Sequence, residues 1–259
     1  MCDDGWNAGW HERNGGNLTY RMTAEDVSVC RDDFCCGGEW KDMGVTAKNL
    51  ADEFFLTTGS GKYFRNVKAS PDENIGIIEI SPNAEKYRIV WGLSGGGMPT
   101  SEFPSHFLNH SARLKVTGGN SRVIYHAHTP DIIALTYILP LTDKAFSRVL
   151  WQCATECPVV FPQGVGVVEW MVPGGANIAH ASMKLMEKYE AVVWAHHGLF
   201  CAGADFDETF GLMHTIEKAA GIYLRILSSG KNIKQTITEQ NLCDVAAAFG
   251  VEINKENLN

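Results

Sequence analysis

The sequence has no excess of positive charge, no long apolar run and no paired-cysteine motif. Its 22 Lys and Arg residues are outnumbered by 30 Asp and Glu residues, which gives a formal net charge of −8 at pH 7. We do not expect such a chain to bind nucleic acid or an anionic membrane as its main partner. No apolar segment reaches the roughly 18 residues that a membrane span needs, and no signal peptide begins the chain. A cytoplasmic protein is therefore predicted.

The eight cysteines show neither the C-x-x-C spacing nor the pattern of a small disulfide-rich fold. A chain of 259 residues buries enough apolar surface to be stable without disulfides. We interpret the adjacent Cys35 and Cys36 as an incidental reduced pair rather than a bridge or a redox switch.

Two catalytic arrangements are missing as well. The segment 59–62 resembles a P-loop only superficially, because Leu56 and Tyr63 stand where a Walker A motif needs Gly and Ser or Thr. Nucleotide hydrolysis is therefore unsupported. No lysine lies inside an apolar strand, so a Schiff-base mechanism lacks an obvious nucleophile. A metal ion is the better candidate for an electrophile.

What the sequence does contain is a succession of short strands and longer helices without an internal repeat or a dividing linker. Strands are predicted at 18–21, 53–58, 75–80, 87–91, 122–128, 159–161, 165–168 and 191–195. Helices are predicted at 1–10, 99–116, 131–139, 143–155, 175–189, 205–228 and 239–249. The helix 99–116 is expected to carry Pro104 in its first turn and to end at Gly118 and Gly119. Residues 22–50 show no clear periodicity. We predict a single domain over 1–259, whose first helix lacks its earlier part.

The segment 122–128 carries two histidines with the spacing of a metal site. Its Val-Ile-Tyr run has β character, and side chains alternate between the faces of a strand. His126 and His128 are therefore expected to project from the same face, roughly 6.5–7 Å apart at Cα. Two imidazoles at that distance can grip one metal ion, although a pair of partly buried structural histidines shows the same pattern.

A catalytic zinc ion needs three protein ligands and one open position. His197 is our preferred third ligand, because it follows the strand 191–195 and precedes Gly198, which lets the backbone turn sharply. His106 and His110 are a rival source, since histidines four residues apart on a helix can also bind a metal. The two alternatives remain open on spacing alone.

Glu102 is the obvious general acid or base, because proton transfer at carbon needs a carboxylate close to the metal-bound carbonyl. It shares a predicted helical face with His106 and His110. A solvent-exposed first-turn Glu that offsets the helix dipole has the same sequence signature. Glu156, between Thr155 and Cys157, is a second carboxylate in a mostly apolar neighbourhood.

Two glycine-rich loops are candidates for binding an anion. The segment 12–17 contains Asn14, Gly16 and Asn17, and such residues tolerate the positive φ that turns successive N–H groups toward one point. A plain turn is an equally good interpretation. Ser60 and Gly61 lie in a second loop that follows the strand 53–58.

Taken together, these segments resemble the class II, zinc-dependent sugar-phosphate aldolases of the fuculose aldolase (AraD-like) family. The segments that carry the resemblance are 12–17, 57–66, 99–106, 123–128, 159–162, 170–174, 194–198 and 207–211. They run in order over nearly the whole chain. His196, beside the third histidine, departs from the family pattern.

The resemblance implies an α/β fold with three αβα layers, in which helices cover both faces of a central, mainly antiparallel sheet. It implies one zinc ion per subunit on His126, His128 and His197, and Glu102 as the catalytic acid/base. The phosphate pocket implied for the substrate consists of Asn14, Gly16, Asn17, Ser60, Gly61 and Ser101. A homotetramer is implied too, in which Glu156 reaches the site of a neighbouring subunit.

The activity implied is the reversible cleavage of L-rhamnulose 1-phosphate to dihydroxyacetone phosphate and L-lactaldehyde, in L-rhamnose degradation. An L-fuculose- or L-ribulose-phosphate enzyme of the same family is the nearest alternative. A zinc hydrolase in which Glu102 activates water is an alternative from another class, and it has no need for two phosphate loops. A non-catalytic metal-binding protein is a third, and it predicts a closed fourth ligand such as His106.

Overall fold

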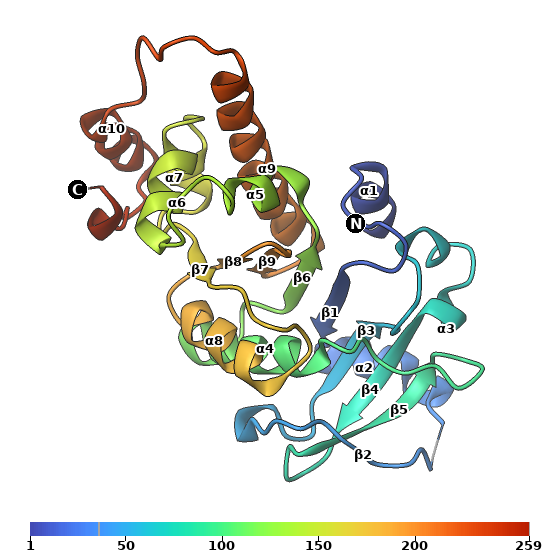
Figure 1. Ribbon diagram of the computed structural model, residues 1–259. Coiled ribbons are helices and arrows are strands. Elements are labelled where there is room, and N and C mark those ends of the chain that lie inside the picture. Colours follow the sequence, from blue (N-terminus) through green and yellow to red (C-terminus); the bar gives the residue numbers. More distant parts are fainter. Residues whose placement is uncertain (36, 259) are drawn as a thin grey trace.

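The computed structural model describes residues 1–35 and 37–258, and Cys36, half of the predicted cysteine pair, lies outside them. Within this part of the chain, the strands form one sheet in the order β2-β5-β4-β3-β1-β6-β9-β8-β7 (Figure 1). The strands are β1 Asn17–Arg21, β2 Lys41–Asp42, β3 Phe54–Thr58, β4 Ile75–Ile80, β5 Lys86–Gly92, β6 Val123–Ala127, β7 Gly166–Val168, β8 Ala191–Trp194 and β9 Gly198–Gly203. β7 and β8 pair in parallel, and the other pairs between these strands are antiparallel.

Helices cover both faces of this sheet, which confirms the expected three-layer αβα arrangement (Figure 1). The helices are α1 Cys2–Asn7, α2 Ala24–Cys30, α3 Pro71–Asn74, α4 Phe103–Thr117, α5 Pro130–Leu135, α6 Asp143–Trp151, α7 Cys157–Val160, α8 Ala176–Met186, α9 Phe206–Ser228 and α10 Glu239–Phe249. Short 3₁₀ turns lie at Arg31–Asp33, Lys48–Leu50, Phe64–Asn66 and Lys255–Asn257. α4 and α8 pack together on one face, and α5, α6, α7 and α9 lie on the other. None of the described helices has the length and apolar character needed to cross a membrane.

The alternation of side chains along β6 assigns its residues to the two layers. Val123, Tyr125 and Ala127 belong to the core beneath α5, α6 and α9. Ile124 belongs to the core beneath α4 and α8, which fixes the face of His126, two residues later. Burial of the apolar residues of β6 on both faces holds this strand rigidly in the centre of the sheet.

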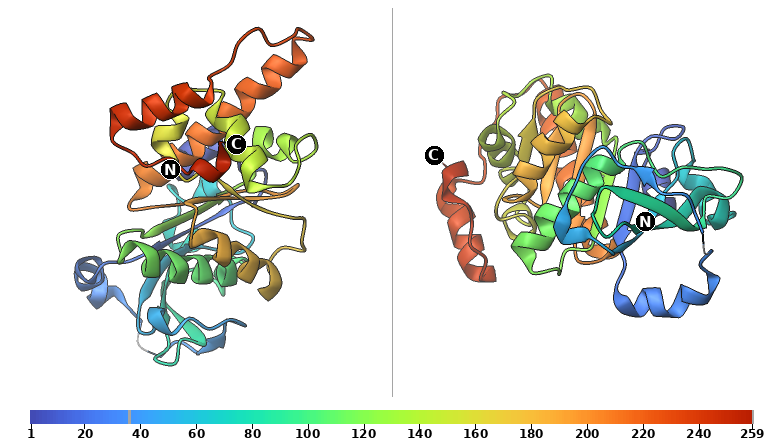
Figure 2. Two further views of the ribbon diagram at one scale, coloured as in Figure 1. Left: turned by 90° about the vertical axis from the view of Figure 1, so that its left-hand side faces the viewer. Right: turned by 90° about the horizontal axis from the view of Figure 1, so that it is seen from below.

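Several predicted elements need correction. The segment 22–50 was expected to be irregular, yet it contains α2, which begins with a capping box between Thr23 and Asp26. α2 lies at the opposite end of the protein from α10 (Figure 2). Because α2 has no buried residue, its sequence lacks the apolar periodicity by which a helix is recognised. The predicted strand 159–161 falls largely on α7 instead. The strand β9 was not predicted.

The predicted helix at 99–116 is present as α4, but its beginning differs from expectation. The N-cap residue is Glu102, and no side chain caps the helix there. Pro104 occupies the first turn and the helix ends at Gly118, which has φ of 62°, as the sequence predicts. The Glu102 side chain is thereby free to point away from its own helix.

Candidate active site

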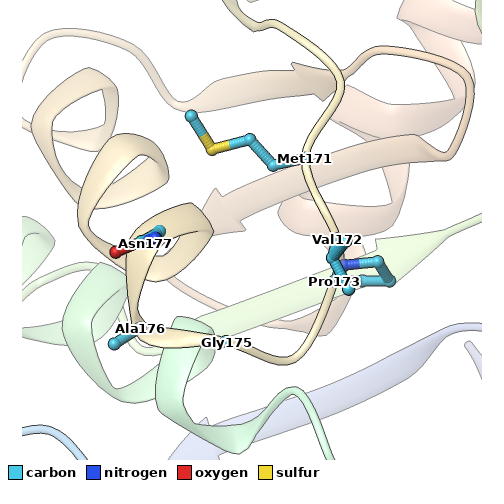
Figure 3. Close-up of a pocket in the computed structure, with 6 residues that line it drawn as sticks. All are labelled: Met171, Val172, Pro173, Gly175, Ala176 and Asn177. Atoms are coloured by element: carbon cyan, nitrogen blue, oxygen red, sulfur yellow. The ribbon is translucent and has the colours of Figure 1, made fainter.

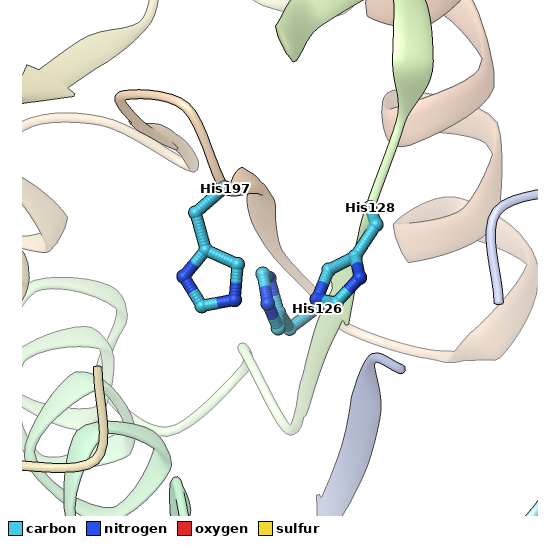
Figure 4. A group of neighbouring side chains, drawn as sticks. All are labelled: His126, His128 and His197. Atoms are coloured by element: carbon cyan, nitrogen blue, oxygen red, sulfur yellow. The ribbon is translucent and has the colours of Figure 1, made fainter. Parts of the chain in front are cut away.

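Three histidines from two distant segments lie close together where the central strand β6 ends (Figure 4). His126 lies in β6 and His128 just after it, while His197 lies in the turn between β8 and β9. One ring nitrogen of each lies within 4.8 Å of the others. The ring centroids of His126 and His128 are 5.3 Å apart, and that of His197 is 4.9 Å from each. The structure thus brings together the preferred three histidines.

The hydrogen bonds of these rings leave nitrogen lone pairs available for a metal ion. His126 Nδ1 donates to Leu199 O at 3.1 Å, so Nε2 carries the lone pair, and Nε2 has no partner among the described residues. His128 Nδ1 lies 2.6 Å from Glu12 Oε1. Burial, followed by the proximity of His128, lowers the pKa of His197 to about 4. Burial likewise lowers the pKa of His126 well below its ordinary value. The neutral rings of His126 and His197 fit a divalent metal ion, which binds unprotonated imidazole.

The turn that carries His197 is held by its neighbours. His196 has a φ of 60°, and its backbone N–H donates to Thr136 Oγ1 at 3.1 Å. A Cβ on Gly198 would collide with Ala127 O in the facing strand β6. Glycine is therefore required here, as its position after His197 suggests, and His196 supports the turn through its backbone.

Glu102 reaches the histidine group from the beginning of α4. Its carboxylate oxygens lie 3.6 Å from His126 Nε2 and 3.7 Å from His197 Nε2, and the residue is only 7% exposed. Asn17 Nδ2 donates to Glu102 Oε2 at 2.9 Å. Burial raises the pKa of Glu102, although this donor and the nearby His128 act in the opposite direction. A carboxyl group whose pKa moves toward neutrality can both give and accept a proton.

The first predicted anion loop lies directly against the histidines. A Cβ on Gly15 would lie 2.8 Å from His128 Nδ1, and a Cβ on Gly16 would lie 2.7 Å from His126 O. His11 Nδ1 donates to Gly15 O at 3.0 Å and thereby fixes the loop. Asn14 is exposed, whereas Asn17 is buried with its side chain against Glu102.

The second predicted loop packs beside the segment that leads into α4. Ser60 N donates to Met98 O at 2.8 Å, and Thr100 N donates to Thr58 O at 2.9 Å. Ser60 and Ser101, both exposed, line a common pocket of about 260 Å³. Gly61 is exposed, with a φ of 71°. These contacts bring two segments of the predicted phosphate pocket together.

Two predicted features lie outside this group. Glu156 is exposed at the beginning of α7, which packs against α9 and α10, and no hydrogen bond or ion pair joins it to the described histidines. His106 and His110 do not join the metal-binding group, since ring nitrogens of both are hydrogen-bonded to Thr19.

A separate hollow of about 440 Å³ lies between residues 171–173 and the beginning of α8 (Figure 3), and it is lined by none of the predicted site residues.

Two functional contacts were missed in the sequence. Glu12 was noted only as the first residue of a loop, and Thr19 only as part of a strand. Strand alternation places Thr19 on the same face as Asn17, which is a usable signal once β1 is known to pair with β6. The approach of Glu12 to His128 has no local sequence signal, because 116 positions separate the two residues.

The comparisons with known proteins agree with this geometry. The model of the class II aldolase and adducin N-terminal domain family matches residues 1–224. The chain belongs to this family. A rhamnulose-1-phosphate aldolase of Klebsiella pneumoniae subsp. pneumoniae is 45% identical over 249 residues, which cover 96% of this chain and 90% of that protein. A rhamnulose-1-phosphate aldolase of Yersinia pestis is 45% identical over 248 residues, with the same coverage of both chains.

Solved structures of class II aldolases share the fold. A sugar-phosphate aldolase from Thermotoga maritima superposes with a TM-score of 0.70 at 27% identity, covering 90% of this chain and 94% of that one. An L-fuculose-1-phosphate aldolase from Thermus thermophilus gives a TM-score of 0.56 at 20% identity, with the same coverage, and supports the fold alone. The chain is therefore a class II aldolase, a metal-dependent enzyme family, and its histidine group could hold the metal ion.

Proposed function

We propose that this aldolase cleaves L-rhamnulose 1-phosphate reversibly to dihydroxyacetone phosphate and L-lactaldehyde, with one zinc ion per subunit. The relatives at 45% identity are named for this substrate, and they match nearly the whole chain. His126, His128 and His197 would hold the zinc ion. When bound, the ion supplies Lewis-acid polarisation of the ketose oxygens.

The observation that carries this proposal is the position of Glu102. Its carboxyl group lies beside ring nitrogens of two histidines, at 3.6 and 3.7 Å, and it is buried with a raised pKa. Cleavage of the C3–C4 bond passes the C4 hydroxyl proton to water as the aldehyde forms and leaves an electron pair at C3. The Glu102 carboxylate takes up a proton from water in exchange. Glu102 gives its proton to C3, and in the synthetic direction its carboxylate removes the same proton.

The phosphate group would be bound at a distance from the reacting bond. Asn14, Gly16 and Asn17 from one loop, with Ser60, Gly61 and Ser101 from the other, are the proposed phosphate-binding residues. An amide nitrogen carries two hydrogens, so Asn17 Nδ2 can donate to Glu102 and still offer one N–H to an anion. Binding energy from the phosphate then orients the sugar for the proton transfer.

The full assembly is proposed to be a cytoplasmic homotetramer of single-domain subunits. Glu156 is exposed in the single chain, and we assign it a role in the site of a neighbouring subunit. Light scattering coupled to size-exclusion chromatography tests the tetramer. A Glu156→Ala variant that lost no activity as a tetramer would remove Glu156 from this role.

The proposed reaction is tested by its substrate and its metal. The purified protein is assayed for dihydroxyacetone phosphate release from L-rhamnulose, L-fuculose and L-ribulose phosphates, with and without a chelator, and its bound metal is measured. We expect the highest kcat/KM for L-rhamnulose 1-phosphate and loss of activity in chelator. Preference for another sugar phosphate would reassign the substrate, and chelator-insensitive cleavage would exclude the zinc mechanism. Cleavage of none, with hydrolysis of an ester instead, would favour the zinc hydrolase.

A further inference from the structure

A continuous line of hydrogen bonds runs from Glu102 into the core. Asn17 Nδ2 donates to Glu102 Oε2 at 2.9 Å, and Asn17 Oδ1 is hydrogen-bonded to His106 Nε2. Thr19 Oγ1 lies 2.8 Å from His106 Nδ1 and 2.8 Å from His110 Nε2. Each of the five residues is at most 7% exposed. β1 supplies Asn17 and Thr19, and α4, covering that face, supplies the two histidines.

We propose that Thr19, His106 and His110 are positioning residues, which with Asn17 form a one-way chain of donors ending on the Glu102 carboxylate. This chain of hydrogen bonds holds the carboxyl group in a fixed orientation. This inference rests on the proposed role of Glu102, but the direction of the chain can be tested without it.

The direction follows from what each group can donate. The Asn17 amide nitrogen faces Glu102 and donates to it, so the Asn17 carbonyl oxygen, which only accepts, faces His106. His106 Nε2 therefore carries a hydrogen, and its bare Nδ1 accepts from the Thr19 hydroxyl. The hydroxyl oxygen in turn accepts from His110 Nε2. His110 Nδ1 is then left bare, in agreement with its lack of a partner among the described residues.

The opposite direction has two costs. It turns the Asn17 carbonyl toward Glu102, which only a protonated carboxyl group can satisfy. It also leaves His110 Nδ1 as a buried N–H donor without an acceptor, and an unsatisfied buried donor costs roughly 1–3 kcal/mol. The forward direction therefore satisfies these groups and gives the Glu102 carboxyl group an oriented donor.

His106 and His110 can each donate one hydrogen bond and accept another because both rings are neutral. Burial lowers the pKa of His106 to about 3 and holds that of His110 well below its ordinary value, with His106, Arg21 and Arg122 adding to the effect at His110. Each ring therefore has one hydrogen and one lone pair at any pH at which the enzyme works. The titratable groups that face Glu102 are those of His126, His128 and His197.

The hydrogen positions are tested directly by NMR of the full-length protein with ¹⁵N-labelled histidine. We expect His106 and His110 to be neutral, each with its hydrogen on Nε2, and single-histidine variants assign the signals. A hydrogen on Nδ1 of His106, or a protonated His106 at pH 7, would contradict the proposed chain of hydrogen bonds, whatever the enzyme's substrate is.

A second test uses matched threonine variants. Thr57 in β3 lies opposite Thr19 in the sheet, is equally buried, and donates only to Thr58 O among the described residues. Thr19→Val breaks the chain, Thr19→Ser keeps its hydroxyl, and Thr57→Val removes a neighbouring hydroxyl that contacts neither histidine. The readout is the rate of hydrogen exchange at the hydroxymethyl carbon of dihydroxyacetone phosphate, which corresponds to C3 of the sugar phosphate and requires a correctly oriented Glu102.

In Thr19→Val we expect the exchange rate to fall roughly tenfold, because the donor to Glu102 is no longer held in place. Thr19→Ser should restore the rate, and Thr57→Val should match the original protein. Equal rates for Thr19→Val and Thr57→Val would refute the positioning role. Absence of exchange in the original protein would instead reject the proposed function. The NMR experiment would still determine the direction of the hydrogen bonds.

Discussion

His128 Nδ1 lies 2.6 Å from Glu12 Oε1, so a carboxylate from the loop 12–17 supports one histidine of the metal-binding group. The Glu12 side chain is 65% exposed, and its contact with Nδ1 leaves Nε2 as the candidate metal ligand. Such a contact fixes the ring orientation and places the hydrogen on Nδ1, which leaves Nε2 to bind the metal.

Replacing Glu12 is therefore expected to weaken metal binding without unfolding the protein. For Glu12→Ala we expect metal affinity to fall by about 10–100-fold, measured by competition with a chromophoric chelator. Glu25→Ala is the control, because Glu25 is an exposed first-turn residue of α2. Equal affinities for the two variants would show that the contact between Glu12 and His128 has no effect on the metal.

Glu102→Gln separates proton transfer from metal binding. The amide keeps the size of the side chain but cannot exchange a proton with carbon, so kcat should fall by about 10²–10⁴. Metal content should stay unchanged, since the three histidines are intact. His197→Ala provides the contrast, because it should lose both metal and activity. A Glu102→Gln variant with full activity would remove Glu102 from its proposed role.

The part of this site that could be predicted from sequence depends on local periodicity. His126 and His128 share a face because strand side chains alternate, and that geometry needs only two residues of spacing. The end of α4 at Gly118 was equally local, since a left-handed residue terminates the helix. Such features are encoded in a few neighbouring residues.

The contacts of the candidate site that the sequence did not predict depend on which strands pair in the sheet. β1 pairs with β6, which brings Asn17 opposite His126 and lets Asn17 reach Glu102, 85 positions away. The spacing of His106 and His110 made them a rival source of ligands, and only the approach of Thr19 from β1 shows that both rings are engaged in hydrogen bonds. Long-range pairing is set by the global packing of the sheet, which no local window contains.

A buried carboxyl group outside the site predicts a pH-dependent stability. Glu217 in α9 accepts from Asp131 N at 2.9 Å and Ile132 N at 3.0 Å, at the beginning of α5. Burial raises its pKa from 4.5 to about 7. Because the folded state binds this proton more tightly than the unfolded state, its contribution is fully present below pH 4.5 and is lost as pH rises through about 7.

The loss is about 3 kcal/mol at ~1.4 kcal/mol per pKa unit, for a pKa raised from 4.5 to about 7. Glu217→Gln has no proton to lose, so its free energy of unfolding should fall less between pH 5 and 8 than that of the original protein. Urea unfolding at fixed protein concentration measures the difference. Glu25→Gln is the control, and parallel pH curves for Glu217→Gln and the original protein would contradict the raised pKa.

Variants of two glycines with the same backbone conformation distinguish the cost of backbone strain from the cost of a close contact with neighbouring atoms. Gly16 and Gly44 both have a φ of 74°, which costs any other residue roughly 1–2 kcal/mol. A Cβ on Gly44 meets no described atom within 4 Å, whereas one on Gly16 contacts His11 Nδ1 and lies 2.7 Å from His126 O.

Gly44→Ala should therefore lower the free energy of unfolding by the backbone cost alone, and Gly16→Ala by a further ~1–3 kcal/mol, since it also displaces the loop. Gly16→Ala should in addition raise KM for the sugar phosphate, because the displaced loop carries proposed phosphate donors, while Gly44→Ala leaves KM unchanged. Urea unfolding and steady-state kinetics of both variants measure these effects. Equal stabilities and equal KM values would mean that the loop 12–17 tolerates displacement and does not form the phosphate pocket.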